Sequence, residues 1–416
     1  MKGAINMKIT TVKGTRDYLP NEMALRDYMQ IKILEEYQKN GFDRIGTPIL
    51  EDAENLDKSD GGENLNLIFK VLKRGDKLQK AFEKGKLNEL CDMGLRYDLT
   101  LPLSRYYANN KEKLMLPFKC IQIDKVYRAE RPQRGRDREL IQCDIDIIGS
   151  NSLDSEIELI DITSKALLSV GIKDFTIKIN DRRLLKSALL SFGIEDTQIE
   201  NVCITIDKMD KIGLDGLRAE LEEKNINREV INKILNFLGN KVELDDMENI
   251  SGEKEIVEGL KKIINSIKEL SKGNYNIQFD LSLVRGQGYY TGTIFEIESN
   301  KFQSSIGGGG RYDNLIGKFT GEKMPAVGFS IGFERIFTLL TEDGFIIPDM
   351  KNKIAIIYKS EDFLNAYIEA DYFRTKFDVV LYEMPKKLGK FIDKLALNGF
   401  YGFYIYGEGN EIKQLI

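Results

Sequence analysis

The feature that most constrains the fold is the basic segment Tyr127–Gly149 together with the strand pattern on either side of it. Residues 120–127 and 139–148 alternate apolar and polar side chains, as half-buried strands do, and a Pro/Gly/Arg cluster separates them. Alternate residues of a strand share a face, so we predict a hairpin whose second strand has one core face. The other face of that strand carries the amide and carboxylate groups of Gln142, Asp144 and Asp146.

The loop of this hairpin is unusually basic. Guanidinium groups bind phosphate through two parallel hydrogen bonds, so a dense group of them favours a polyanionic ligand. A solvated hairpin whose charges serve only solubility is the alternative, and the acidic strand face beside the loop argues against it. The loop arginines are Arg128, Arg131, Arg134, Arg136 and Arg138.

The segment Tyr127–Arg136 resembles motif 2 of the class II aminoacyl-tRNA synthetases, in the version found in histidyl-tRNA synthetases. The resemblance implies an α+β fold in which helices flank an antiparallel sheet. It also implies that Arg128 meets the charge on the α-phosphate of ATP and that Arg136 also binds ATP. Glu130 would hold adenine. The acceptor end of the tRNA would meet the side chains of Gln133 and Arg134.

Composition describes an ordinary soluble globular protein, with 42% hydrophobic and 31% charged residues among 416. The chain contains no histidine, which excludes Ser-His and Cys-His nucleophilic machinery. The net charge of −5 does not exclude tRNA, because the basic loop can contact phosphate locally. As a hypothesis, a chain without histidine suits an enzyme made when histidine is scarce; compositional drift is the alternative.

Several classes of protein are excluded by what the sequence lacks. The four cysteines are widely spaced and show no paired-ligand pattern, so we expect neither a disulfide framework nor a zinc site. No apolar run has the length of a membrane span, and no secretory signal precedes the first motif. We therefore expect a cytoplasmic protein without a membrane partner, beginning at Met1 or Met7.

The N-terminal part predicts a helix and a strand. Asn21 can cap a helix with an apolar face, and Asn40-Gly41 can end it. A strand-like run from Arg44 to Leu50 contains Pro48, which suits an edge or an interface. In the family these elements form motif 1, so the resemblance implies a homodimer; a plain helix and edge strand is the alternative.

A third segment begins at Leu95. We expect a strand with Arg96 and Asp98 on one side, although Asp98 followed by Thr100 fits a helix cap equally well. The segment resembles the substrate-binding strand of the family. The resemblance implies that Asp98, with Gln142 and Asp146, reads the amino and imidazole groups of histidine.

The segment Leu283–Glu296 resembles the first histidine-specific signature of the family, although a glycine-rich hairpin is the alternative. The resemblance implies that Arg285 is a catalytic arginine near the substrate carboxylate and the α-phosphate. Tyr289 and Tyr290 would line the side-chain pocket. The family usually has Leu-Asp where this chain has Gln287-Gly288, a departure that removes a carboxylate from the expected pocket.

Two further segments complete the catalytic pattern. The run Gly307–Leu315 resembles the second histidine-specific signature, in which Tyr312 faces the imidazole. The run Val327–Arg335 resembles motif 3, a strand followed by a helix. By this resemblance Arg335 stacks on adenine, touches the γ-phosphate and joins Arg128 and Arg285 as a catalytic cation.

We expect two domains. Residues 1–345 would form the catalytic domain, with amphipathic helices inserted at about 185–272. Residues 350–416 alternate as βαβαβ, which predicts a small parallel sheet with covering helices. This part resembles the anticodon-binding domain of the family but looks shortened, because the chain stops before the usual closing strand and helix.

The resemblance implies a ligase that activates histidine with ATP and Mg²⁺ and transfers it to tRNA(His). The first alternative is an inactive regulatory subunit of ATP phosphoribosyltransferase, a relative that commonly lacks the motif 2 and motif 3 arginines. Arg128, Arg136 and Arg335 favour the ligase, whereas Gln287-Gly288 and the short end favour the regulator. The second alternative is a paralogue that activates an amino acid for another purpose.

Overall fold

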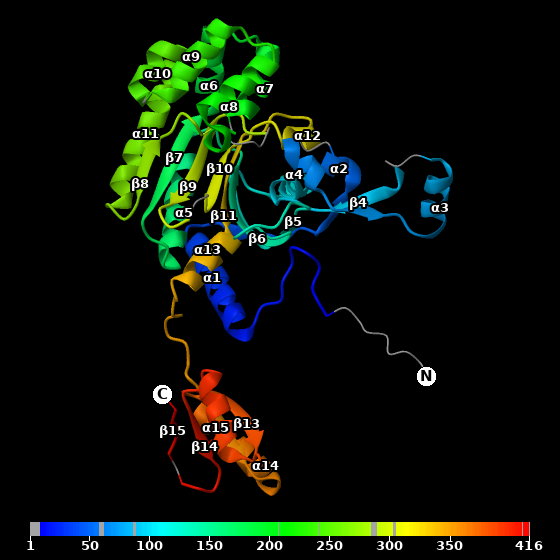
Figure 1. Ribbon diagram of the computed structural model, residues 1–416, viewed down its shortest axis with the longest axis vertical. Coiled ribbons are helices and arrows are strands. Elements are labelled where there is room, and N and C mark those ends of the chain that lie inside the picture. Colours follow the sequence, from blue (N-terminus) through cyan, green and yellow to red (C-terminus); the bar gives the residue numbers. More distant parts are fainter. Residues whose placement is uncertain are drawn as a thin grey trace. The chain divides into compact units, whose positions relative to one another are not determined.

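The computed structural model describes residues 9–57, 62–85, 89–206, 208–240, 242–283, 289–302, 305–409 and 411–415. The chain divides into two compact units, Met1–Phe345 and Ile346–Ile416, which are described separately below (Figure 1).

The first unit is built on an eight-stranded sheet with the order β1-β5-β6-β11-β10-β9-β7-β8. The inner pairings are antiparallel, and only the outer pairs β1·β5 and β7·β8 are parallel. The predicted α+β fold with an antiparallel sheet flanked by helices is confirmed. In sheet order the strands are Asp43–Arg44, Phe118–Tyr127, Glu139–Ile148, Ala326–Gly332, Gly307–Arg311, Thr293–Ser299, Phe175–Asp181 and Asn276–Phe279.

The centre of the sheet is the predicted hairpin. Strands β5 and β6 pair along their whole length, from Phe118 opposite Ile148 to Tyr127 opposite Glu139. The apolar face of β6 is core, since Ile141, Cys143, Ile145 and Ile147 are all buried. Burying this face on the helices behind it forces the polar side chains of β6 to the opposite side of the sheet.

Four helices pack against the sheet or one another: α1 (Pro20–Lys39), α5 (Asp154–Ser169), α11 (Lys254–Ser271) and α13 (Phe333–Glu342). Helix α1 buries Leu25, Met29 and Ile33 at helical spacing. It starts at Pro20, one residue before the expected cap Asn21, because proline is well suited to the first turn. The Glu22 carboxylate accepts a hydrogen bond from the Leu19 amide (2.7 Å), which caps this end instead.

The expected strand from Arg44 to Leu50 is wrong. Strand β1 ends at Arg44, and β2 (Leu50–Asp52) belongs to a different, three-stranded sheet. Pro48 lies in the connection, where its missing N–H is not required by a ladder. The small sheet also contains β3 (Lys70–Leu72) and β4 (Cys91–Leu95).

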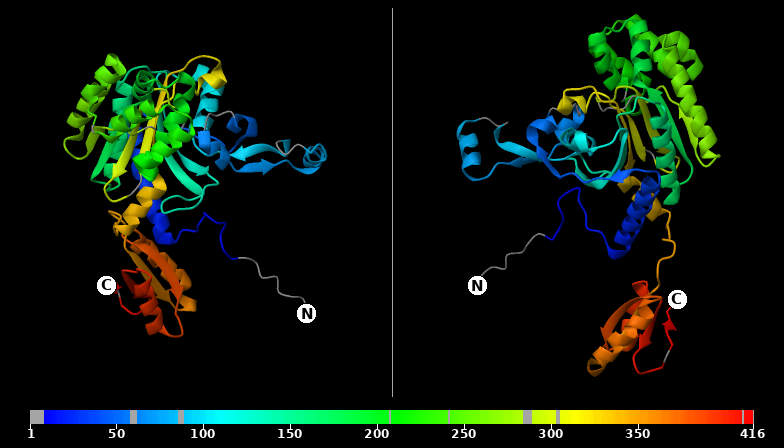
Figure 2. Two further views of the ribbon diagram at one scale, coloured as in Figure 1. Left: turned by 45° about the horizontal axis from the view of Figure 1, so that its top comes forward. Right: turned by 180° about the vertical axis from the view of Figure 1, so that it is seen from behind.

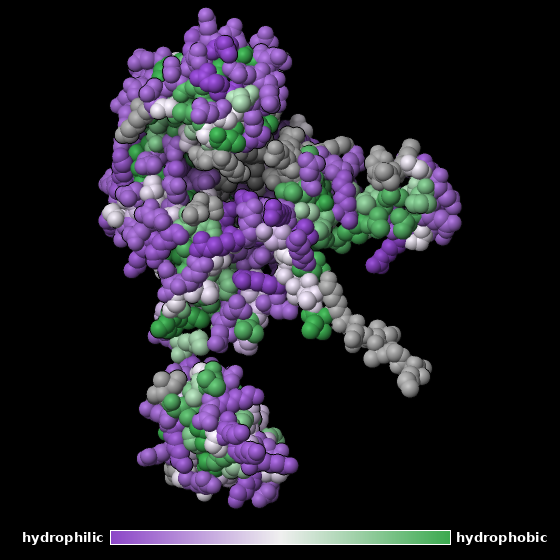
Figure 3. Space-filling view, in the orientation of Figure 1, coloured by the Kyte–Doolittle hydropathy of each residue, from purple (hydrophilic) through white to green (hydrophobic). Residues whose placement is uncertain are grey.

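This small sheet projects from the first unit as an arm with α3 (Gly75–Glu83) at its tip (Figures 1 and 2). Leu72 and Phe82 are exposed on the arm, where Figure 3 shows hydrophobic residues together. The short α2 (Ala53–Asp57) and the 3₁₀ turn Gly62–Leu67 complete it.

The strand predicted to carry Arg96 and Asp98 is also wrong. Strand β4 ends at Leu95, and helix α4 (Thr100–Asn110) begins shortly afterwards. The Leu101 amide donates to the Asp98 carboxylate (3.3 Å), so the alternative, a helix cap, is the correct interpretation.

Helices follow one another between β7 and β8, as expected for the amphipathic insertion at about 185–272. The apolar residues that recur at helical spacing from Leu217 to Leu238 belong to two of these helices, because α8 ends at Glu223 and α9 starts at Arg228. Polar residues cover most of this segment on the face seen in Figure 3. The helices before α11 are Arg182–Phe192, Ile199–Ile206, Met209–Glu223, Arg228–Gly239 and Leu244–Ser251, numbered α6 to α10.

The second unit is a four-stranded sheet with the order β13-β12-β14-β15. Strands β12 (Lys353–Tyr358), β13 (Asp378–Glu383) and β14 (Gly402–Ile405) are parallel, and β15 (Lys413–Gln414) is antiparallel to β14. Helix α14 (Phe363–Arg374) packs with Ile356, whereas α15 (Leu388–Leu397) packs with Ala355 and Ile357. The two helices therefore cover opposite faces of the sheet. The βαβαβ pattern predicts the parallel strands and the covering helices, but not the antiparallel β15.

None of the helices in the described part of the chain is long and apolar enough to span a bilayer. The remaining short element of the first unit is α12 (Gly317–Thr320).

Candidate active site

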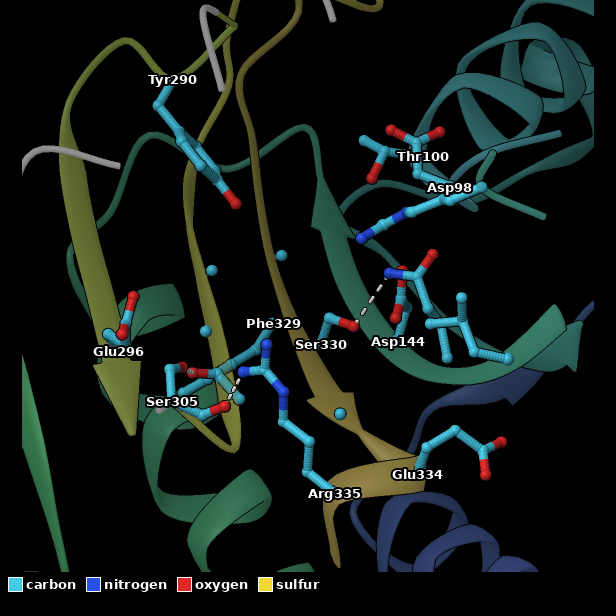
Figure 4. A pocket seen from close by; sticks show the side chains of 18 of the residues that line it. Asp98, Thr100, Asp144, Tyr290, Glu296, Ser305, Phe329, Ser330, Glu334 and Arg335 are labelled. Atoms are coloured by element: carbon cyan, nitrogen blue, oxygen red, sulfur yellow. Dashed lines mark hydrogen bonds between the residues drawn. The ribbon is translucent and has the colours of Figure 1, made fainter. Parts of the chain in front are cut away.

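A cavity of about 550 Å³ lies over the polar face of the large sheet. Its lining comes from β6, β7, β9, β10 and β11, from the starts of α4 and α13, and from the hairpin loop. Figure 4 shows Asp98, Asp144, Tyr290, Glu296 and Arg335 surrounding it from these different elements.

The register of the sheet explains why these residues meet. Asp144 lies opposite Ser330, which lies opposite Gly308, then Glu296 and then Lys178. Residues directly opposite each other share a face, so this row forms a polar floor. All five residues line the cavity.

The neighbouring row explains one of the glycines. Asp146 lies opposite Gly328, and a Cβ atom at Gly328 would stand 2.0 Å from the Asp146 Oδ1 atom. Glycine at 328 therefore makes room for the carboxyl group. The Tyr312 hydroxyl donates a 2.6 Å hydrogen bond to the same oxygen.

One end of the cavity is acidic and buried. Asp98, Asp144 and Asp146 are at most 5% exposed. Burial disfavours the charged form, and it raises the pKa of Asp98 to about 6 and that of Asp146 to about 7. Burial, with the nearby Asp146 charge, also raises the pKa of Asp144 well above its usual range. This end is built to receive a group that donates hydrogen bonds or carries positive charge.

Tyrosine rings form a wall beside this acidic end. The ring centroids of Tyr289 and Tyr290 are 4.9 Å apart, and those of Tyr289 and Tyr312 are 6.1 Å apart. All three tyrosines are buried and line the cavity. Burial raises the pKa of Tyr289 and of Tyr312 well above the usual value, so both hydroxyls are protonated.

The other end is cationic. Arg128 Nε donates to the Tyr97 carbonyl (2.8 Å), and the Arg335 guanidinium donates to the Ser305 carbonyl, as Figure 4 shows for Arg335. Arg136 lies 3.5 Å from Glu130 and is about half exposed. The arrangement can hold a polyanion such as a triphosphate.

A buried ion pair supports the cationic end. Glu334 accepts two hydrogen bonds from Arg26 of α1 (2.6 and 2.8 Å) and one from the Ile141 amide of β6 (3.2 Å). The Arg26 guanidinium also lies 4.0 Å from the Tyr18 ring centroid. These contacts hold the start of α13, and with it Arg335, against the central hairpin.

Two predicted residues, Gln133 and Arg134, are not among those that line the cavity. The backbone of Gln133 exchanges hydrogen bonds with that of Arg136 (3.0 and 2.9 Å), which close the loop. Arg134 forms an exposed ion pair with Glu342, and its guanidinium lies 4.6 Å from the Phe302 ring centroid.

The remaining predicted residues of the site fall into two groups. Arg285 and the Gln287-Gly288 departure lie outside the described residues. Cavity-lining positions are occupied by Asp98, Arg128, Glu130, Arg136, Gln142, Asp146, Tyr289, Tyr290, Tyr312 and Arg335.

Sequence reasoning missed several lining residues: Thr100, Asp144, Lys178, Glu296 and Ser330. Asp144 shares the predicted polar face of Gln142 and Asp146, so the apolar/polar alternation of this strand was enough to predict that it faces the cavity. Lys178, Glu296 and Ser330 are placed by pairing between distant strands, and Thr100 is placed by the start of α4, neither of which a local pattern shows. Within the described ranges, no group of three or more acidic, cysteine or histidine side chains could hold a metal ion.

Comparisons with known proteins agree with one another. Residues 14–336 match the family model described as histidyl-tRNA synthetase. The histidine–tRNA ligase of Leifsonia xyli subsp. xyli (strain CTCB07) is 39% identical over 411 residues, which cover 95% of this chain and 94% of that relative. That of Christiangramia forsetii is 38% identical over 369 residues, covering 83% and 80%.

Solved structures show the same fold. A histidyl-tRNA synthetase from Nostoc sp. PCC 7120 is 28% identical with a TM-score of 0.77, over 96% of this chain and 91% of that one. A protein described as an ATP phosphoribosyltransferase regulatory subunit/histidyl-tRNA synthetase from Bacillus halodurans C has a TM-score of 0.78 at 21% identity, over 96% and 98%. By the match over residues 14–336 and the 39% identity to a relative of nearly equal length, this chain belongs to the histidyl-tRNA synthetase family.

Proposed function

We propose that this chain activates histidine with ATP to form histidyl-adenylate and then transfers the histidyl group to tRNA(His). The observation that carries the proposal is a single cavity with a buried acidic and tyrosine-lined end and an arginine-lined end. The first end suits an amino acid with a hydrogen-bonding side chain, and the second suits the phosphates of a nucleotide.

Histidine would lie over β6, with its imidazole between the tyrosine rings and Asp146. Tyr312 holds Asp146 in place by its 2.6 Å hydrogen bond. Gln142 and Asp98 would complete the pocket, and both line this end. An acidic pocket of this kind recognises an imidazole without containing a histidine of its own.

ATP would occupy the cationic end. Arg335 would stack on adenine and reach the γ-phosphate, while Arg128 would meet the α-phosphate. Glu130 would hold the adenine edge, and Arg136, 3.5 Å from Glu130, would contact the nucleotide beside it. We keep Arg285 as the third catalytic cation on the strength of the motif alone.

The activation step requires no general base, because the substrate carboxylate is already ionised and is itself the nucleophile. Its oxygen attacks the α-phosphorus, and pyrophosphate leaves with the bonding electrons. Preorganised arginines stabilise the charge that develops on both groups. The absence of histidine from the chain is therefore compatible with the chemistry.

The cavity lining fits Mg²⁺ as well as ATP. Mg²⁺ keeps several waters and takes one or two carboxylates together with phosphate oxygens, so it does not need three protein ligands. Glu296 lies on the floor of the cavity, with Glu298 and Lys178 (3.1 Å apart) beside it. Glu296 would hold the ion, which when bound neutralises charge on the polyphosphate.

For the second step, the exposed hairpin loop with Gln133 and Arg134 would meet the acceptor end of the tRNA. The second unit, with its parallel sheet, would bind the anticodon.

We also propose a homodimer, as in motif 1 of the family, and a cytoplasmic place of action. Exposed apolar side chains on α1 and near β2 support an interface there: Ile31, Ile49 and Leu50.

The regulatory-subunit alternative is not favoured. The curated relatives cited above are named as ligases, and one of them matches nearly the whole chain. The likeness to the Bacillus halodurans structure concerns the fold alone, at 21% identity. In addition, Arg128 and Arg335, which such regulators commonly lack, both line the cavity.

The test is charging of tRNA(His) by purified protein with ATP, Mg²⁺ and labelled histidine. We expect labelled tRNA with the wild type and a loss of about a hundredfold or more with Arg335→Ala. A folded wild type that binds histidine but forms neither adenylate nor charged tRNA would refute the proposal. Pyrophosphate exchange without charging would instead identify the paralogue that activates an amino acid for another purpose.

A further inference from the structure

Arg138, the last of the loop arginines, is used differently from the arginines of the cationic end. Among the described residues that line the cavity are Arg128 and Arg136, but not Arg138. Its contacts are within the protein: the Arg128 amide donates to the Arg138 carbonyl (2.9 Å), and Arg138 Nε donates to the Glu130 carbonyl (3.0 Å). Arg138 therefore holds the backbone at two residues that we assign to ATP.

A third contact of Arg138 reaches the N-terminal part of the described chain. The Arg138 amide donates a 2.7 Å hydrogen bond to the Gly14 carbonyl. Gly14 lies in a turn that the Thr15 amide closes by donating to the Val12 carbonyl (2.9 Å), and its φ of 86° favours glycine. A Cβ atom at Gly14 would stand 2.7 Å from Arg138 Cγ and 2.8 Å from Pro132 Cγ. The turn therefore packs closely on the base of the loop.

The same N-terminal segment is anchored on the second element of the cationic end. The Tyr18 hydroxyl donates to the carboxylate of Glu334 at the start of α13 (3.3 Å). Between the two anchors, Arg16 lies 3.8 Å from the carboxylate of Asp137 in the loop. Residues 12–18 thus contact both the hairpin loop and the start of α13, the two elements that carry the arginines of the cavity.

We propose that the turn at Gly14 positions the ATP-binding loop: through Arg138 it fixes the backbone that carries Arg128 and Glu130. Arg138 is then a positioning residue rather than a phosphate ligand. Charged groups stabilise a developing charge only where they are preorganised, and a displacement of about 1 Å can cost about a hundredfold in rate. This inference rests on the proposed function, because its measure is the use of ATP.

The test is a double-mutant cycle in histidine-dependent pyrophosphate exchange with Gly14→Ala, Arg138→Ala and the two changes combined. Each single variant should lower kcat/KM for ATP about ten- to hundredfold, while the KM for histidine stays within about twofold. The combined variant should lie within about threefold of Arg138→Ala, because the Cγ atom that the added methyl group would meet is then absent. Losses that multiply would overturn the coupling between Gly14 and Arg138.

Gly41→Ala is the matched control. Gly41 has a φ of 83°, close to the 86° of Gly14, but no atom lies within 4 Å of its added Cβ. The control should lower the unfolding temperature, because alanine disfavours this φ, and leave exchange within about twofold of the wild type. A loss of exchange equal to that of Gly14→Ala would show that both variants report stability alone, and would overturn the inference.

Arg138→Ala introduces no clash, so it tests the inference even where Gly14→Ala does not fold; thermal unfolding of each variant checks this. Normal exchange by folded Arg138→Ala, with a raised KM for tRNA, would assign Arg138 to a tRNA phosphate and overturn this inference alone. A folded wild type without histidine-dependent exchange would overturn the proposed function and this inference together.

Discussion

The two ends of the cavity are built in different ways. At the acidic end, Asp144 and Asp146 come from the middle of a central strand and are almost fully buried. At the cationic end, Arg136 comes from a loop and is about half exposed, and Arg335 is held by a contact to the Ser305 carbonyl. The rigid, dry end suits selection of one amino acid, and the wetter end suits a large nucleotide that must enter and leave.

The comparison predicts that variants at one end change only the affinity or reactivity of the ligand at that end. The cationic end gives the largest effect. Arg335→Ala should lower the rate of adenylate formation about a hundred- to thousandfold, measured by pyrophosphate exchange, because one preorganised cation is lost. The dissociation constant for histidine should change less than about twofold. An equal loss in histidine affinity would show that the two ends are not separate.

The buried Asp146 carboxyl at the acidic end should lower the free energy of unfolding as the pH rises. Asp146 has its pKa raised from 3.8 to about 7, so above pH 7 the folded state holds a buried charge that the unfolded state holds in water. Below pH 3.8 the carboxyl is protonated in both states and this cost is absent. Removing the carboxyl with Asp146→Asn should therefore stabilise the protein relative to the wild type at high pH.

Denaturant unfolding of both proteins at pH 4 and pH 8 measures the effect. The free energy difference in favour of Asp146→Asn should grow by on the order of 2–4 kcal/mol between these values, from a shift of about three units. A difference that does not depend on pH would mean that this end is more hydrated than its burial indicates.

Gly328 offers a way to disturb the acidic end without changing a charge. The methyl group of Gly328→Ala would lie 2.0 Å from Asp146 Oδ1, so the carboxyl must move and lose its bond to Tyr312. Histidine should bind about ten- to hundredfold more weakly, while the KM for ATP stays within about twofold. Gly389→Ala is the control, because no atom lies within 4 Å of its added Cβ. A rise in the KM for ATP would contradict the separation of the ends.

The smallest effect concerns the outside of the cationic end. Arg134 pairs with Glu342 at the surface, and such pairs contribute less than about 1 kcal/mol to stability. Arg134→Ala should raise the KM for tRNA about two- to fivefold and leave pyrophosphate exchange unchanged. Glu342→Ala keeps the cation and should leave charging intact. An equal rise in the KM for tRNA in both variants would show that the ion pair with Glu342, rather than a phosphate contact of Arg134, supports tRNA binding.

The acidic end was largely predictable from the sequence and the cationic end less so. Period-two alternation places Gln142, Asp144 and Asp146 on one face, and register then fixes them. The pattern around Asp98 fits a strand and a helix cap equally well, and only the structure decides: β4 ends at Leu95 and the Asp98 carboxylate accepts the Leu101 amide at the start of α4. A short alternating run cannot reveal where a strand stops.

Long-range pairing is what the sequence could not show. Lys178 and Glu296 line the cavity only because β7 pairs with β9 in the sheet and puts the two residues opposite each other. The Arg26 and Glu334 pair joins residues more than three hundred positions apart. Each looks like an ordinary charged residue in its own segment. Family motifs located the arginines, but neither motif nor periodicity gave the contacts that hold them.

The most direct test of the account is the steady-state kinetics of histidine-dependent pyrophosphate exchange by the wild type and by Asp146→Asn and Arg335→Ala. The account predicts that Asp146→Asn raises the KM for histidine at least tenfold with the KM for ATP unchanged, and that Arg335→Ala lowers kcat with the KM for histidine unchanged. Variants that change both KM values in parallel, or a wild type with no exchange, would contradict it.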